Sequence, residues 1–215
     1  RLEVNLDALQ HNLNFYRSLL QPKTKIMVMV KAFAYGSGSY EVARLLQYNR
    51  VDYLAVAYTD EGVELRQKGI RLPIMVMNPS PETFAKLVEY RLEPELYNER
   101  IFRSFGTFIK GKNSGQFPVH IKFDTGMRRL GFEQKEWEML KALCLEFPSL
   151  QIQTAFTHLA GSDGDEHQAF SIGQLENFQS MASQLEGFLG REIIKHALNS
   201  PGITRFPNWQ FDMVR

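Results

Sequence analysis

The sequence has one cysteine in 215 residues, no long apolar run and almost no net charge. The single Cys144 excludes an internal disulfide framework and is typical of a reducing compartment, and its apolar neighbours predict a packing role. Without about 18 consecutive apolar residues or a signal-peptide pattern, the chain is expected neither to span a membrane nor to be secreted, so we expect it in the cytoplasm. A formal net charge of +1 gives no reason to expect a nucleic acid or an acidic membrane surface as partner.

The chain does contain a regular alternation of short apolar runs and helical patterns. Its length, with 44% hydrophobic and 23% charged residues, suits one large globular domain, and no change in composition marks a second one. We therefore predict an α/β fold, a (β/α)8 TIM-type barrel over residues 1–215. An open doubly wound sheet is the alternative, because alternation does not decide closure. Strands are expected at 26–30, 53–57, 73–77, 92–97, 119–123, 150–157, 193–198 and 211–215.

Helical patterns fill the intervals between these strands. An opening helix is expected to be capped by Asp7, after a segment at 1–5 that alternates as a strand does. The sequence lacks an initiator Met and stops within or just before its eighth strand, so we expect a part of a longer protein. Further helices are expected at 40–48, at 59–69, at 134–146 and at 168–189. Two more are expected, one that begins at about residue 80 and one that ends at about residue 109.

The first apolar strand leads directly into a lysine. Lys31 follows five apolar residues, and a desolvated lysine at a strand end is an amine whose pKa falls until it can form a Schiff base. Tyr35 supplies a phenol, and Gly36 and Gly38 let backbone N–H groups approach an anion such as phosphate. Together these residues suggest a phosphorylated aldehyde. The alternative is a lysine that simply extends into solvent.

Polar residues stand where the predicted strands end, and in a barrel these ends meet at one rim. Each has an ordinary structural explanation alone: Lys122 or Arg129 as partner of Asp124, His158 as a core histidine, and the segment 199–201 as a helix cap or turn. Finding all of them on one rim favours a functional site. The five histidines show no paired spacing with other ligands, so we predict no metal site. The rim residues are Lys31, Lys122, Arg129, His158, Asn199, Ser200 and Arg215.

Five ordered motifs resemble those of alanine racemases, which are pyridoxal-phosphate enzymes of fold type III. The segment 31–38 (KAFAYGSG) is similar to the pyridoxal-phosphate lysine motif, and 124–132 (DTGMRRLGF) is similar to the second family signature. The segments 157–160, 196–200 and 212–215 continue the match in family order. The chain thus resembles the N-terminal barrel domain over its whole length. It departs at Phe33, where the family usually has Asn, and at Arg128, where it usually has Gly.

The resemblance implies a role for each rim residue. Lys31 would hold pyridoxal 5′-phosphate as an aldimine and act as the catalytic base on one face of the alanine Cα. Arg129 would bind the cofactor's phenolic oxygen and place the substrate carboxylate, and Lys122 matches a lysine that is carbamylated in some members. An arginine keeps its proton, so Arg215 would leave the pyridine nitrogen unprotonated and limit side reactions. The cofactor-binding residues would be Lys31, Tyr35, His158, Asn199, Ser200 and Arg215.

The resemblance also implies the rest of the enzyme. The activity would be interconversion of L- and D-alanine, which supplies D-alanine for bacterial peptidoglycan. The second base would be a tyrosine from the C-terminal β domain of the partner in a homodimer; that domain is absent from these residues, so the fragment alone should racemise poorly. Three alternatives stay open: a non-catalytic pyridoxal-phosphate carrier, a racemase or decarboxylase for another amino acid, and a cofactor-free phosphate-binding barrel.

Overall fold

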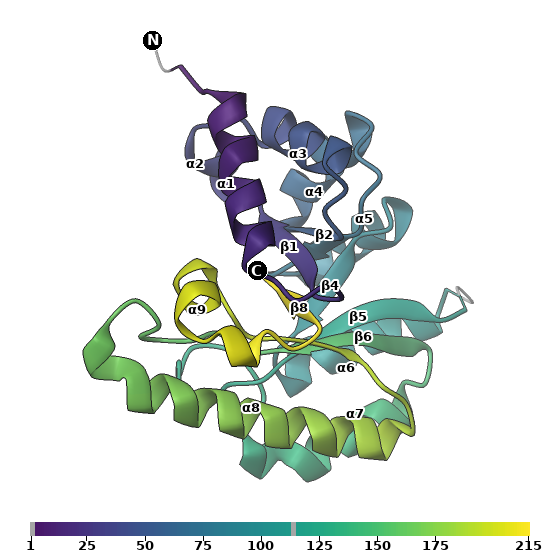
Figure 1. Ribbon diagram of the computed structural model, residues 1–215. Helices are drawn as coiled ribbons and strands as arrows, with labels where there is room; N and C mark the ends of the chain where they lie inside the picture. The colour runs from purple at the N-terminus through teal and green to yellow at the C-terminus, as the bar shows by residue number, and fades with distance from the viewer. Residues whose placement is uncertain (1–2, 113–114) are drawn as a thin grey trace.

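The computed structural model describes residues 3–112 and 115–215, and its strands form one closed parallel barrel in chain order from β1 to β8 (Figure 1). Each strand pairs in parallel with the next, and β8 returns to pair with β1. The predicted barrel is confirmed and the open doubly wound sheet is wrong. The strands are β1 (Lys25–Met29), β2 (Tyr53–Val56), β3 (Ile74–Val76), β4 (Glu93–Leu96), β5 (Phe117–Lys122), β6 (Leu150–Phe156), β7 (Ile194–His196) and β8 (Met213–Val214).

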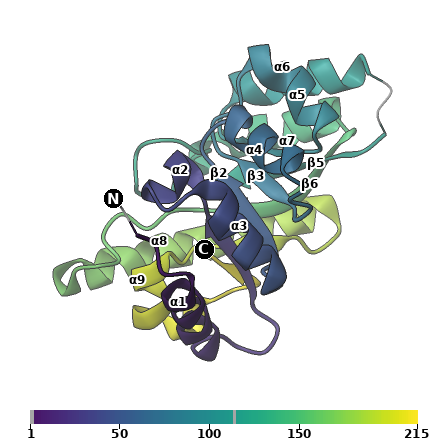
Figure 2. The same cartoon turned by 90° about the horizontal axis from the view of Figure 1, so that it is seen from above.

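Helices follow the strands and cover the outside of the barrel, as Figure 2 shows from above. The 3₁₀ turns η1 to η4 span Pro81–Thr83, Gln134–Glu136, Asp165–His167 and Pro207–Trp209. No helix within residues 3–112 and 115–215 has the length and apolar composition needed to cross a bilayer. The α-helices are α1 (Leu6–Ser18), α2 (Lys31–Tyr35), α3 (Ser39–Tyr48), α4 (Thr59–Gln67), α5 (Phe84–Glu89), α6 (Glu99–Lys110), α7 (Trp137–Glu146), α8 (Gln168–Leu189) and α9 (Ser200–Arg205).

The opening helix begins earlier than predicted. Asn5, not Asp7, is its N-cap, because the Asn5 side chain accepts a hydrogen bond from Ala8 N at 3.1 Å. Asp7 instead lies in the first turn, where its charge faces the positive end of the helix dipole. The predicted strand at 1–5 is wrong for residues 3–5, which are in neither strand nor helix, and its first two residues lie outside the described chain.

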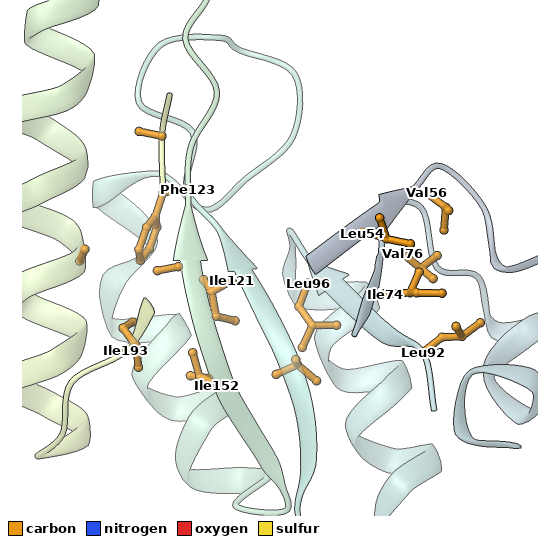
Figure 3. Close-up of a cluster of buried hydrophobic side chains, with 14 of the residues drawn as sticks. Leu54, Val56, Ile74, Val76, Leu92, Leu96, Ile121, Phe123, Ile152 and Ile193 are labelled. Atoms are coloured by element: carbon orange, nitrogen blue, oxygen red, sulfur yellow. The ribbon is translucent and has the colours of Figure 1, made fainter. Parts of the chain in front are cut away.

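Alternation along each strand divides the apolar side chains into two layers. Outward residues such as Leu54, Ile74 and Ile121 pack under the helices in the main core, which Figure 3 shows in close-up. Inward residues such as Met27 and Met75 form a smaller cluster inside the barrel. Both layers are needed, because a strand in a helix-covered barrel is buried on each face.

The barrel interior is polar on the side formed by β4, β5, β6 and β7. Burial is complete for four of the interior polar side chains and nearly complete for Lys122, which is 2% exposed. These residues meet one another rather than water: His120 Nδ1 lies 2.9 Å from Thr154 Oγ1, which lies 3.3 Å from His196 Nε2. The barrel interior is therefore polar up to the rim. The five buried polar side chains are Glu95, His120, Lys122, Thr154 and His196.

The segment that follows α1 contacts the C-terminal segment of the chain. The last turn of helix α1 lies close to the C-terminal end of the chain (Figure 1). The Gln210 side chain accepts a hydrogen bond from Gln21 N at 2.9 Å and donates one to Leu19 O at 2.7 Å. Backbone bonding continues the closure, since Lys25 N donates to Asp212 O at 2.9 Å. These contacts bring Lys31 and Arg215 to the same rim.

Candidate functional site

Lys31 follows β1 and opens a turn with left-handed backbone. Ala32, Phe33, Ala34 and Tyr35 all have φ between 48° and 55°, a conformation that costs an L-residue about 1–2 kcal/mol each. The Glu61 carboxylate compensates by accepting hydrogen bonds from Ala32 N at 2.6 Å and Ala57 N at 2.7 Å. Lys31 itself is half-buried.

The sequence suggested that the glycines after this turn offer backbone N–H groups to an anion. In the structure the N–H groups of both glycines are already hydrogen-bonded. Gly36 N and Gly38 N both donate to Phe33 O, at 3.0 and 3.1 Å. Their φ angles of 93° and 86° explain the choice of glycine, because they let the chain leave the left-handed turn. Tyr35 is 77% exposed, so its predicted role at the phosphate stays a prediction.

A cavity of about 220 Å³ brings together Lys31, Lys122 and Arg129 with Glu95. Lys122 Nζ lies 3.3 Å from Glu95 Oε1, so the suggested pairing of Lys122 with Asp124 is wrong. Burial lowers the pKa of the Lys122 ammonium, and Glu95 raises it in part. The cavity therefore holds a cluster of cations around one buried carboxylate.

Asp124 shapes the loop that carries Arg129. Its carboxylate accepts hydrogen bonds from the backbone N–H groups of Gly126, Arg128 and Arg129, each at 2.9 Å. Although burial acts in the opposite direction, these bonds lower the pKa of Asp124 and keep it ionised. Arg129 is thus fixed through its backbone, and its guanidinium is left for the cavity.

His158 and Arg215 contact each other across the rim. Arg215 Nη2 donates to His158 Nδ1 at 2.9 Å, and since an arginine only donates, Nδ1 must be the unprotonated ring nitrogen. Burial, followed by the charge of Arg215, lowers the pKa of His158 to about 3, so the ring is neutral. Burial lowers the pKa of Arg215 to about 10, which leaves it charged at neutral pH.

Phe156 joins this pair to the cationic cavity. Arg215 Cζ lies 5.0 Å and Lys122 Nζ 5.6 Å from the centre of its ring, within cation–π range. The His196 ring stacks on Phe156 with centroids 4.8 Å apart and planes within 7°. The buried Phe156 ring therefore contacts both Arg215, the partner of His158, and Lys122 of the cationic cavity.

Asn199 and Ser200 line a second cavity of about 370 Å³, together with His158 and Arg215. The Asn199 Oδ1 accepts hydrogen bonds from Gly202 N at 3.1 Å and Ser162 Oγ at 2.7 Å, so the predicted cap is confirmed and α9 begins there. Ser200 is exposed. All the sequence-predicted residues except Tyr35 thus lie along one of the two cavities.

Three residues of this site were not predicted from the sequence: Glu61, Glu95 and Phe156. Glu61 and Glu95 stand in patterns typical of a helix start and of a weak strand, and Phe156 reads as an ordinary core residue. The alternation of Glu93 and Glu95 with apolar residues in β4 was the one available signal for an inward-facing acid. Within residues 3–112 and 115–215, no cluster of His, Cys, Asp or Glu could hold a metal ion.

Comparison with known proteins identifies this arrangement. The family model "Alanine racemase, N-terminal domain" matches residues 4–215. The chain belongs to this family. The alanine racemase barrel accounts for the order of motifs along the chain, from the lysine turn to Arg215.

The relatives include alanine racemases from several organisms. "Alanine racemase 1" of Oceanobacillus iheyensis is 32% identical over 215 residues, covering 100% of this chain and 57% of that protein. The alanine racemase of Methanococcus maripaludis is 36% identical over 219 residues, covering 99% of this chain and 57% of that protein. The chain thus spans a little more than half the length of these relatives.

A solved alanine racemase structure, from Clostridium difficile 630, has the same fold. It matches with a TM-score of 0.91 and 33% identity, over 100% of this chain and 58% of that chain. The same enzyme in complex with cycloserine matches with a TM-score of 0.92 and 34% identity, over 99% and 58% of the two chains.

Proposed function

We propose that this chain is the barrel part of a pyridoxal-phosphate-dependent alanine racemase that interconverts L- and D-alanine. The observation that carries the proposal is the gathering of Lys31, Lys122, Arg129 and Arg215 around one rim, with neutral His158 bonded to Arg215. A lysine nucleophile among fixed cations suits an aldehyde that carries phosphate and a substrate that carries a carboxylate.

The residues present fit pyridoxal 5′-phosphate. Arg215 Nη1 is buried and has no hydrogen-bond partner among the residues that the structure describes, so this N–H is available to a ring nitrogen, which accepts but does not donate. Lys31 supplies the amine, while Tyr35, Asn199 and Ser200 are the residues assigned to cofactor binding. When bound, the cofactor supplies an electron sink for the bond broken at the substrate Cα.

Residues of this chain carry out proton transfer and bind the substrate. The Lys31 amine removes a proton from one face of the substrate Cα and can return it. The Arg129 guanidinium binds the substrate carboxylate and so fixes which face is presented to Lys31. Arg215 remains charged and donates its proton only as a hydrogen bond, which limits the electron withdrawal available to side reactions.

Racemisation also needs an acid–base group on the opposite face of the Cα. We propose that a partner subunit provides this group in a homodimer, from a C-terminal domain beyond these residues. This chain covers 57% of the length of each of these two relatives, which supports the presence of such a domain in the whole protein. The enzyme would act in the cytoplasm and supply D-alanine for peptidoglycan.

The test is racemisation by the full-length protein. In D2O, alanine should lose its optical activity and gain α-deuterium at comparable rates, whereas serine and other amino acids should react more slowly. A non-catalytic cofactor carrier would bind the cofactor and exchange no α-proton. Equal or faster exchange of another amino acid would assign the site to that substrate.

A further inference from the structure

The anion that faces the cations of the site is Glu95 of β4. Its side chain is fully buried, and its Oε1 lies 3.3 Å from Lys122 Nζ on β5. The strand register pairs Glu95 with His120, and since side chains alternate along a strand, Lys122 faces the interior with them. The geometry thus places a carboxylate and an ammonium together inside the barrel, near the residues proposed to bind the cofactor.

The balance of charge in the cavity depends on this carboxylate. The side chains that line the cavity include the three cations Lys31, Lys122 and Arg129, and Glu95 is the one acid among the described residues that line it. Burial raises the pKa of Glu95, and the charges of Lys122 and Arg215 oppose that rise and favour the carboxylate form. A buried ammonium without a counter-charge is strongly unfavourable, so Glu95 is what allows Lys122 to stay charged among the other cations.

Lys122 matches a lysine that is carbamylated in some members of the family, and carbamylation here would reverse the charge beside Glu95. In that reaction a neutral amine attacks CO2, an N–C bond forms, and a proton leaves the nitrogen to give a carbamate anion. The new anion would stand next to the Glu95 carboxylate, out of contact with water. Two like charges in contact repel more strongly in the protein interior than in water, because the effective dielectric constant is lower there.

We infer that Glu95 is a positioning residue that supplies the negative charge of this site and holds Lys122 as an unmodified ammonium. Glu95 thereby supplies the negative charge that a carbamate on Lys122 would otherwise supply. The inference rests on the proposed function, since it concerns the same cofactor and substrate site.

Carbon NMR of the full-length protein in ¹³C-bicarbonate tests the inference without an activity assay. The wild-type protein is expected to show no carbamate resonance, and a carbamate on Lys122 would overturn the inference. Because this measurement needs no variant, it decides the question even if substitutions at Glu95 impair folding.

The variant Glu95→Gln removes the charge with little change in shape. It should gain a carbamate on Lys122 at raised bicarbonate concentration, and failure of a folded Glu95→Gln protein to gain one would also overturn the inference. Glu93→Gln is the matched control: Glu93 faces the same interior from the same strand but lies 3.0 Å from His120, and this variant should gain none.

These outcomes separate the inference from the proposed function. A carbamate in a wild-type protein that racemises alanine would overturn the inference alone. An unmodified Lys122 in a protein that neither binds the cofactor nor exchanges an α-proton would overturn the proposed function alone.

Discussion

The Glu61 carboxylate accepts a hydrogen bond from the backbone N–H of Ala32, the residue after Lys31, at 2.6 Å. Through its other oxygen Glu61 holds Ala57 N and Tyr58 N at 2.7 and 3.1 Å, so it ties the lysine turn to the end of β2. A carboxylate is suited to this position because it only accepts hydrogen bonds, and it can accept several.

Replacing Glu61 with Ala should release the lysine turn. The left-handed residues 32–35 would lose a charge-assisted bond of about 1.5–3 kcal/mol, so cofactor affinity is expected to fall by about tenfold or more. Titration of the apoprotein with pyridoxal phosphate, followed by absorbance, measures this change. Glu64→Ala on the same helix removes only an exposed pair with Lys68 and serves as the control; equal affinities in the two variants would contradict the role of Glu61.

His158 should make the protein sensitive to acid. Its pKa of about 3 in the folded state lies below the value of about 6.5 in an unfolded chain, so the unfolded state takes up the proton first as the pH falls. The stability from this residue is therefore complete above about pH 6.5 and is lost progressively toward pH 3.

A His158→Gln variant keeps an acceptor for Arg215 but cannot be protonated in this range. Between pH 6 and pH 4 it should lose about 2 kcal/mol less unfolding free energy than the wild type. Denaturant titrations at both pH values measure the difference. The same substitution at the surface residue His167 should leave the wild-type dependence unchanged, and parallel curves for wild type and His158→Gln would exclude a buried neutral His158.

Gly131 is required where the arginine loop returns to the barrel. Its φ is +133°, and a Cβ there would lie 2.4 Å from Asp124 N and 2.6 Å from the carbonyl carbon of Phe123. Because these are backbone atoms that cannot rotate away, Gly131→Ala should lower the unfolding free energy by about 3 kcal/mol. It should also weaken substrate binding through Arg129.

The control for this substitution lies in α8. A Cβ on Gly173 would meet no atom within 4 Å, so Gly173→Ala should raise stability by about 0.5–1 kcal/mol through helix propensity. Thermal unfolding compares the two variants. Similar melting temperatures for both would show that the loop tolerates a side chain at position 131.

Apolar periodicity was enough to predict the barrel and most of its elements. Helix α8 has the predicted bounds 168–189, and all eight strands lie where apolar runs were found, although most are shorter. The strand at β4 was the weakest of these patterns for a physical reason. Its alternate residues Glu93 and Glu95 face a polar barrel interior, whereas a buried strand is ordinarily recognised by apolar residues on both faces.

The rest of the site depends on contacts that no local pattern contains. Four consecutive L-residues in a left-handed turn run against local preference, and the turn after Lys31 is held by Glu61 from 29 positions away. The Glu95–Lys122 pair likewise exists only once the register of β4 and β5 is set. Sequence motifs located the cations of the site, but the carboxylates that organise them required the closed barrel.

The most direct test of the account is the site of cofactor attachment in the full-length protein. After incubation with pyridoxal phosphate and reduction with borohydride, digestion and mass spectrometry should find the pyridoxyl group on Lys31. Lys31→Ala should show neither the label nor racemisation, whereas Lys25→Ala, at an exposed lysine of β1, the strand before Lys31, should show both. A label on another lysine, or racemisation that persists in Lys31→Ala, would contradict the account.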